Sequence, residues 1–425
     1  MSIKNSALCL FDDADVQMDI TRTTLVDFYP VHSITPNAPI EFQIPGTPDD
    51  YIDLGDIRIL LHLKITKKDG TALAAADDVA FINLPISSVF QDVFLKIADV
   101  QVEGGQHLYP YNGYISSLLQ FHPSAKKTHM QAWGWYEDTP GAFSDLTTND
   151  GHKSRAEETK TSTIWEIMGP LFLDMTHQSR YLLPSTNLHL KLLPAKPEFC
   201  LLGKAKDYIY EIVKCQLQVP RINVLDSVLG GHHKGLEKFN AKYLLNHIDI
   251  SNFTITKENM TFIKDGLFQA QVPKMLVIGL LDHAAFNGDM TKNPFDFQNF
   301  NLNRIGLYRD GELVPGQILT PDYDQNHFMR AYNQTMDALH YFNTDDSNGM
   351  TIDHFKDGYN LYVFDLTPDN TAQGPHRHLM RTGSLRLELG FKKKLSNAVT
   401  VVLFALVDAK LEITKLRDVI CSYSR

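Results

Sequence analysis

Cysteine is scarce in this chain, and its four cysteines (Cys9, Cys200, Cys215 and Cys421) lie far apart. No C-x-x-C pair joins them, and no cysteine–histidine spacing typical of a zinc site does so either. We interpret them as reduced thiols of a protein made inside a cell. The sequence therefore gives no indication of a disulfide framework.

Long apolar runs are also absent, as is an excess of positive charge. No segment approaches the roughly 20 apolar residues of a membrane-spanning helix, and the first residues lack the charged head and apolar stretch of a secretory signal. Forty basic and fifty acidic residues give a formal net charge of −10, which disfavours a surface that grips polyphosphate. We expect a soluble protein that has no membrane span, is not secreted by the ordinary route and does not bind nucleic acid directly or sequence-specifically.

Motifs that carry catalytic chemistry are missing as well. The sequence has no G-x-S-x-G, no P-loop and no H-E-x-x-H. Adjacent carboxylates occur at Glu157 and Glu158 and at Asp345 and Asp346. Both pairs lie in polar stretches that we interpret as exposed loops, so neither indicates a glycosidase. We expect no catalytic residue and no cofactor.

What the sequence does contain is apolar alternation with a period of two, the pattern of a strand with one buried face. Residues predicted to face a core are Ile57, Ile59, Leu61, Leu63 and Ile65, then Leu188, Leu190 and Leu192, then Val213, Cys215, Leu217 and Val219, and finally Leu385, Leu387, Leu389 and Phe391. Residues predicted to face water are Arg58, His62, Lys64, Thr66, His189, Lys191, Ser384, Arg386 and Glu388. A further strand, VTVVLFALVDAKLEI, follows residue 398. These patterns predict sheets with one wet face.

Helical segments are few, the best candidates being residues 111–121 and 233–245. Most other segments are short strands between Gly, Pro, Asn and Asp turns, which favours β-sandwiches over α/β units. A chain of 425 residues exceeds one ordinary core, and a Gly-Gly pair and a helical crossing follow Pro220. We predict two all-β domains, residues 1–220 and 221–425.

An acidic cluster, Asp49, Asp50, Asp53 and Asp56, precedes the first of these strands in IPGTPDDYIDLGD. It does not match the D-x-[DN]-x-[DN]-G pattern of a calcium loop. We interpret it as a connection whose Tyr51, Ile52 and Leu54 hold it to the sandwich edge. Asp53 and Asp56 are expected to accept hydrogen bonds from backbone or arginine groups near the strand start.

Histidine pairs occur at His376 and His378 and at His232 and His233. His376 and His378 lie on one side of an extended segment and could bind zinc if a third ligand, Cys421 or another histidine, converged on them. Nothing in the sequence indicates that ligand, and the glycines around the second pair indicate a flexible link. We therefore expect no tightly bound metal.

Two aromatic clusters could serve as carbohydrate platforms or as interface anchors. Their members are Trp133, Trp135, Tyr136, Phe295, Phe297 and Phe300. We favour packing in the core or between subunits. The polar segment from Phe143 to Thr163 has no alternating apolar face, so we predict a surface loop whose removal impairs assembly more than folding.

Several longer phrases, taken in order, resemble one protein family. They are PIEFQIPGTPDDYIDLGDIRILLHLKITKKDG, RYLLPSTNLHLKLLPAKPEFCLL, VPKMLVIGLLDHAAFNGDMTKNPFDFQNFNLNRIGLYRDGELVPG, DGYNLYVFDLTPD and GSLRLELGFKKKLSNAVTVVLFALVDAKLEI. Together they resemble the major capsid protein of Polintons (Mavericks) and the related adintoviruses, from about Tyr29 to Ile413. These are large self-synthesising DNA elements of animal genomes.

The resemblance implies a double jelly roll, two eight-stranded antiparallel sandwiches side by side with a few short helices and long inserted loops. It implies a homotrimer that forms a pseudo-hexameric capsomer of an icosahedral virion, with neighbouring capsomers and a single jelly-roll penton or minor capsid protein as partners. The rival hypothesis is a carbohydrate-active enzyme or lectin built on two jelly rolls. It predicts a deep cleft between the domains, lined by Trp and paired carboxylates, and a monomer in solution.

Overall fold

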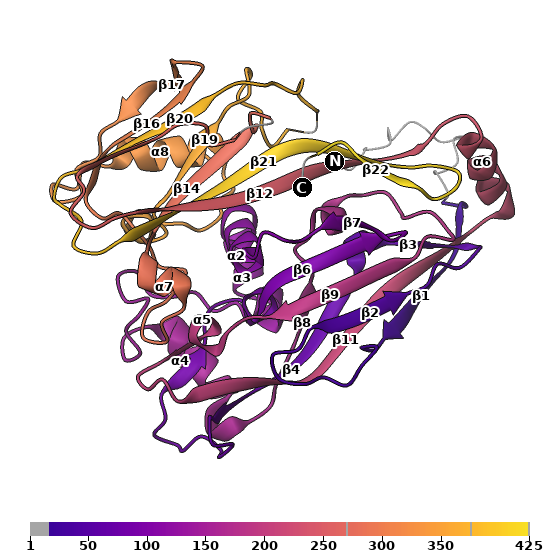
Figure 1. Ribbon diagram of the computed structural model, residues 1–425, viewed down its shortest axis with the longest axis horizontal. Coiled ribbons are helices and arrows are strands. Elements are labelled where there is room, and N and C mark those ends of the chain that lie inside the picture. Colours follow the sequence, from indigo (N-terminus) through magenta and orange to yellow (C-terminus); the bar gives the residue numbers. More distant parts are fainter. Residues whose placement is uncertain (1–16, 269–270, 375, 424–425) are drawn as a thin grey trace, which may run out of the picture.

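The computed structural model describes residues 17–268, 271–374 and 376–423 and consists of two β-rich halves (Figure 1). In the first half, β1, β11, β4 and β8 form one sheet, with β3 attached to β11, and β2, β9, β6 and β7 form a second. A small sheet pairs β5 with β10. The strands are β1 (Ile20–Phe28), β2 (Ile40–Ile44), β3 (Asp50–Ile52), β4 (Arg58–Lys67), β5 (Val79–Phe81), β6 (Phe90–Ile97), β7 (Val100–Glu103), β8 (Trp165–Pro170), β9 (Leu188–Pro194), β10 (Leu201–Gly203) and β11 (Tyr208–Val224).

The second half repeats this plan. One sheet has the order β12, β21, β14, β19, with β22 attached to β21, and the other has the order β13, β20, β16, β17; β15 pairs with β18. The strands are β12 (Ala241–Ile255), β13 (Thr261–Lys264), β14 (Met275–Asp282), β15 (Phe297–Gln298), β16 (Leu302–Arg309), β17 (Glu312–Leu319), β18 (Asp357–Gly358), β19 (Leu361–Asp365), β20 (Leu385–Phe391), β21 (Val399–Ile413) and β22 (Val419–Cys421).

The two halves share one topology. When the attached strands β3 and β22 are left out, eight strands remain in the two main sheets of each half. Counted in chain order, they form one sheet of order 1-8-3-6 and another of order 2-7-4-5 in both halves. All these pairs are antiparallel, and the crossing of distant strands between two facing sheets is the arrangement of a jelly roll. The predicted fold class, an all-β double jelly roll, is confirmed.

Helices are short and lie in the connections between strands. They are α1 (Pro85–Ser88), α2 (Tyr109–Gln120), α3 (Pro123–Lys126), α4 (Asp150–Glu158), α5 (Pro197–Cys200), α6 (Asp226–Leu236), α7 (His283–Asn287), α8 (Met329–Ala338) and α9 (Ile352–Lys356), with 3-10 turns η1 (Leu54–Asp56), η2 (His129–Trp133), η3 (Lys160–Ser162) and η4 (Asp174–His177). The helix predicted at 111–121 corresponds to α2. The helix predicted at 233–245 is wrong beyond Leu236, because β12 begins at Ala241 and pairs with β21 along its whole length.

The division between the halves falls around α6. Within the described ranges, strands up to β11 pair only with one another, and so do strands from β12 onward. Pro220 lies inside β11, opposite Leu25 of β1. The division into residues 1–220 and 221–425 stays a prediction, and we propose that α6, just after Val224, is the linker.

The predicted strand faces are confirmed for most positions. The five inward residues predicted from Ile57 to Ile65 are at most 5% exposed, as are Leu188, Leu190 and Leu192 of β9 and the leucines of β20. Thr66 is an exception, since it was predicted to face water and is 3% exposed.

Val213 was predicted to face the core and is 48% exposed. A bulge explains this, because β11 pairs Ile212 with Leu63 and Lys214 with His62, which leaves Val213 without an opposite residue in β4. Before the bulge the residues of β11 that face the core have even numbers, and after it they have odd numbers.

The central strand β21 departs from the one-wet-face pattern, because side chains on both of its faces are buried from Val399 to Ala409. In Figure 1 the sheet of β12, β21 and β14 lies between α2 of the first half and the outer strands of the second. Backbone N–H groups of β12 donate to the first half, from Ile248 to Asp174 and from Ile250 to Gln106. This sheet therefore forms much of the junction between the halves.

Candidate functional site

The acidic cluster before β4 does not converge on a common point. Asp53 accepts the N–H of Gly55 at 3.0 Å and begins η1, while Asp56 accepts from Arg58 at 2.7 Å. Burial is the main cause that raises the pKa of Asp53 above its ordinary value. The predicted roles of Asp53 and Asp56 are confirmed.

The remaining residues of this segment are structural as well. Asp50 accepts hydrogen bonds from Thr47 and Asn223, and Tyr51, Ile52 and Leu54 are at most 4% exposed. The segment is an anchored connection, as the sequence predicted; the carboxylates of Asp50, Asp53 and Asp56 accept hydrogen bonds, and Asp49 is exposed.

The adjacent glutamates Glu157 and Glu158 each accept a hydrogen bond from a neighbouring side chain. Glu158 accepts from the Tyr136 hydroxyl at 2.9 Å, and Glu157 from Lys160 at 2.9 Å. These glutamates lie in α4, so the prediction that they sit in a loop is wrong.

His232 lies in α6 rather than in a flexible link, and its Nδ1 is 2.7 Å from the Tyr51 hydroxyl. Asp345 and Asp346 are exposed, and Asp346 faces His122 at 3.5 Å. None of these groups forms a paired-carboxylate centre.

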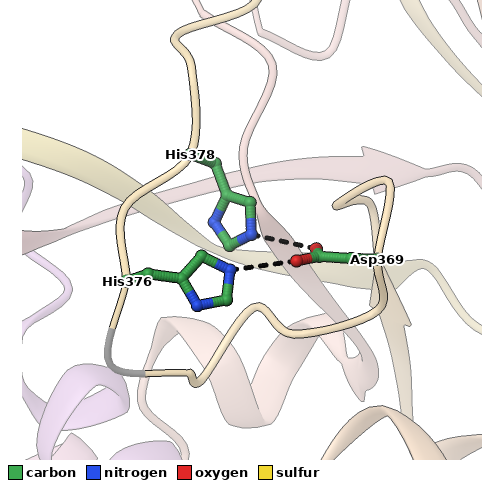
Figure 2. Close-up of side chains that lie close together, drawn as sticks. All are labelled: Asp369, His376 and His378. Atoms are coloured by element: carbon green, nitrogen blue, oxygen red, sulfur yellow. Dashed lines mark hydrogen bonds and ion pairs between the residues drawn. The ribbon is translucent and has the colours of Figure 1, made fainter.

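The imidazoles of His376 and His378 both lie against the carboxylate of Asp369, not against a cysteine (Figure 2). The Nε2 atom of His376 is 2.9 Å from Oδ2 of Asp369, and the Nε2 atom of His378 is 3.0 Å from Oδ1. The hydroxyl of Thr371 lies 3.1 and 3.3 Å from the same nitrogens. The pKa of Asp369 lies well below its usual range. The hydrogen bond from Thr371 is the largest cause, and those from the two imidazoles lower this pKa further. Cys421, the ligand considered from sequence, lies elsewhere in β22, opposite Leu411.

The described thiols fit the reduced state predicted for them. Cys200 and Cys215 are at most 1% exposed, and burial raises the pKa of both thiols. Such buried thiols are inert. Cys9 lies outside the described residues.

The segment from Phe143 to Thr163 supplies Arg155 to the most deeply buried ion pair in the described chain, which the sequence did not reveal. Arg155 of α4 donates to Asp138 at 2.6 Å, and both side chains have 0% exposure. The same guanidinium donates to the carbonyl oxygens of Phe81 and Tyr136 at 2.8 and 2.7 Å. The prediction that this segment contributes nothing to the core is therefore wrong.

Asparagines complete this network and link the two halves. Asn149 caps α4 by accepting backbone N–H bonds, and its Nδ2 donates to Asp138 at 2.8 Å. From the second half, Asn293 donates to the other oxygen of Asp138 at 3.4 Å and to the carbonyl of Phe143 at 3.3 Å. We now expect deletion of this segment to impair folding, because it would remove the partners of a buried charge.

The aromatic clusters lie in the core at the junction of the halves. Tyr114 of α2 stacks on Phe295 of the second half, with ring centroids 4.0 Å apart, and on Trp135, 5.5 Å apart. Trp135, Phe295 and Phe297 are at most 1% exposed. Trp133, Tyr136 and Phe300 are half-buried. The core-packing interpretation is confirmed for the buried members, which cannot act as carbohydrate platforms.

A cavity of about 210 Å³ lies between the halves, below the roughly 300–1,000 Å³ of typical ligand pockets. Its carboxylates have structural partners. Glu103 accepts two backbone N–H bonds from the start of η4, Asp174 faces Nδ1 of His247 at 2.5 Å, and Asp92 accepts backbone N–H bonds. Burial, followed by the charge of Asp174, raises the pKa of Glu103. Two larger hollows, of about 820 and 300 Å³, also lie between the halves. Among the described residues no tryptophan lines any of the three, so they lack the tryptophan-lined cleft that the enzyme or lectin hypothesis predicts.

Asp296 is expected to make stability depend on pH. Burial raises its pKa to about 7 from an ordinary value of 3.8, although Gln298 donates to it at 2.6 Å. The folded state therefore retains a proton that the unfolded state releases, so this stabilising contribution is full below about pH 4 and is lost as the pH rises toward 7. We expect Asp296→Asn to melt above the wild type at about pH 8, with the difference shrinking at about pH 5.

Differential scanning fluorimetry across this pH range measures the effect. Asp265→Asn is the control, because the Asp265 side chain is 76% exposed. A pH-independent difference between Asp296→Asn and the wild type would contradict the assignment.

Comparison with known proteins agrees with the topology. No protein-family model matches the chain. A Caenorhabditis elegans protein described as uncharacterized is 24% identical over 381 residues, which cover 84% of this chain and 86% of that protein. No helix in the described part of the chain is long and apolar enough to cross a membrane.

Solved structures resemble the chain along nearly its whole length. The Sputnik virophage structure has a TM-score of 0.64 at 13% identity and covers 99% of this chain and 92% of that one. The PBCV-1 virus capsid gives 0.60 at 11%, covering 98% and 100%, and the mavirus major capsid protein gives 0.55 at 11%, covering 99% and 94%. At such low identities the likeness shows a shared fold. That fold comprises both jelly rolls of this chain.

Proposed function

We propose that this chain is the major capsid protein of a double-stranded DNA virus or virus-like element, and that its role is assembly rather than catalysis. The observation that carries the proposal is the double jelly roll itself, in which both halves have the same strand order. The structures that resemble it over 95–99% of its length come from the virophage Sputnik, PBCV-1, mavirus and Faustovirus, the last two being described as major capsid proteins. In this role the protein is located in the virion capsid.

The particular kind that we propose is a Polinton (Maverick) or adintovirus capsid protein. The ordered phrases between Tyr29 and Ile413 support this assignment. A relative from a nematode, covering 84% of the chain, is also in keeping with an element that resides in animal genomes.

The assembly that we propose is a homotrimer forming a pseudo-hexameric capsomer, which contacts neighbouring capsomers and a single jelly-roll penton or minor capsid protein. Apolar side chains exposed on the first jelly roll support a subunit contact. Tyr29, Val31 and Val213 are 64%, 45% and 48% exposed and line one hollow of about 700 Å³. Nearby, the edge strand β1 exposes 51% of Leu25. Exposed apolar patches beside an unpaired strand edge are typical of surfaces that another chain covers.

No enzymatic activity is proposed. The carboxylates around the 210 Å³ cavity between the halves are engaged by backbone N–H groups or by His247, and the large aromatic side chains are mostly buried. These arrangements favour a structural role over the carbohydrate-active alternative.

Negative-stain electron microscopy of the purified full-length protein tests this proposal. We expect particles of three chains with a pseudo-hexagonal outline, because six jelly rolls of similar topology would surround one axis. A uniform population of single two-lobed particles, at concentrations where capsomers should persist, would count against it.

A further inference from the structure

We propose that Asp369, His376 and His378 form a binding site for a divalent transition metal, and that zinc is the cation it accepts. The three side chains belong to the connection between β19 and β20, and both imidazoles point toward the carboxylate (Figure 2). One ligand atom from each residue lies within 4.8 Å of the others. This inference concerns a different part of the molecule from the proposed assembly surface and does not depend on it.

The spacing of the three groups suits a metal of zinc's size. Tetrahedral zinc with bonds of about 2.0–2.2 Å separates its ligand atoms by about 3.3–3.6 Å. The imidazole nitrogens lie 2.9 and 3.0 Å from the carboxylate oxygens, so an entering ion needs each of these two separations to widen by a few tenths of an ångström. Two imidazoles and a carboxylate form a ligand set that zinc accepts, whereas calcium and magnesium prefer oxygen ligands alone.

The remaining coordination position is open to solvent. The side chains of Asp369 and His376 are 46% and 53% exposed, which leaves room for water on the metal. The hydroxyl of Thr371, within 3.3 Å of both imidazole nitrogens, can accept a hydrogen bond from such a water. The site therefore offers three protein ligands and one exchangeable position.

The segment that carries the histidines is held in place before any metal arrives. The backbone N–H of His378 donates to Asp408 at 2.9 Å, and Lys274 donates to the same carboxyl group at 2.9 Å. Between the two histidines, the guanidinium of Arg377 donates to the carbonyls of Ala409 and Leu245, each at 2.8 Å. These bonds hold the segment against β21 and β12. Metal binding therefore costs less conformational entropy than it would in a free loop.

Asp369 reaches the histidines because the chain turns back after β19. The N–H of Gly374 donates to the carbonyl of Thr371 at 2.7 Å, which closes the turn. This turn brings the third ligand from seven residues upstream of His376. A metal would then join the start of the connection to its middle.

The affinity is expected to be moderate. Metal-bound imidazoles usually donate their other N–H to a partner, and loss of such a partner weakens binding about 10–100-fold. Nδ1 of His378 is buried and has no hydrogen-bond partner among the residues that the structure describes. We therefore expect zinc to bind in the micromolar range when it is supplied, which is compatible with the expected absence of a tightly bound metal after purification.

Isothermal titration of the chelator-treated full-length protein with zinc chloride tests the site. We expect one zinc per chain in the wild type, with affinity reduced at least about 10-fold in His376→Ala and in Asp369→Asn. His32→Ala is the matched control, because His32 is exposed and lies outside the cluster; its affinity should equal that of the wild type. Magnesium at a large excess should not compete.

Tryptic cleavage provides a second readout, because it reports on the connection between β19 and β20. Arg381 is exposed, three residues beyond His378, and zinc should slow tryptic cleavage after it in the wild type and in His32→Ala but not in His376→Ala. Circular dichroism establishes that each variant is folded. Absence of zinc binding by the wild type, or full binding by both His376→Ala and Asp369→Asn, would overturn the proposal.

Discussion

Leu387→Asp is expected to unfold the second jelly roll. Leu387 has 0% exposure and lies in the central strand β20, opposite Lys264 of β13 and Leu307 of β16. Burial of an unpaired carboxylate costs several kcal/mol or raises its pKa until it is neutral. A domain with a net stability of about 5–15 kcal/mol cannot readily absorb this loss together with the lost leucine burial. Circular dichroism and sedimentation should report an unfolded or aggregated protein.

Arg386→Gln is the matched control for this substitution. The neighbouring Arg386 side chain is 44% exposed on the opposite face, where it pairs with Glu388 at 2.6 Å. An exposed ion pair contributes at most about 1 kcal/mol, so this variant should fold. If Arg386 faces a neighbouring subunit, the variant should fold and yet assemble poorly. A soluble, well-folded Leu387→Asp protein would contradict the strand's register and the sandwich built on it.

Arg155→Ala is expected to lower the free energy of unfolding by about 3–5 kcal/mol, the cost of removing one partner of a buried ion pair. The loss is large because Asp138 would remain buried without its cation, and the carbonyls of Phe81 and Tyr136 would lose their donor. Urea denaturation followed by tryptophan fluorescence measures it, since Trp135 lies in the adjacent core.

Arg58→Ala provides the comparison. The Arg58 side chain is 46% exposed and pairs with Asp56 at 2.7 Å, so its removal should cost at most about 1 kcal/mol. Equal stability of Arg155→Ala and Arg58→Ala would show that the buried network does not stabilise the fold as argued.

The strands that could be predicted from sequence are those that have one face in the core and the other toward water. In β4 and β20 the apolar residues face the core and the charged ones face water, so alternation reveals both the strand and its register. The exposure of Val213 could not be predicted, because the bulge depends on how β11 pairs with β4. The start of β12 was missed for a similar reason, since its partner β21 lies far along the chain.

The polar parts of the structure were harder to predict. Helix α4 buries Arg155 through an ion pair, so it shows no apolar periodicity, although Asn149 followed by Asp150 is a helix-start signal that could have revealed it. Asp369 was overlooked as a ligand because sequence spacing does not show the turn that returns it to His376. Both cases depend on side-chain contacts that alternation cannot report.

Light scattering of the purified protein tests the central claim, that this chain builds a capsid, most directly. We expect a mass of about three times 48.2 kDa, because each chain should cover its exposed apolar surfaces against two neighbours. A single-chain mass that persists as the concentration is raised would contradict it.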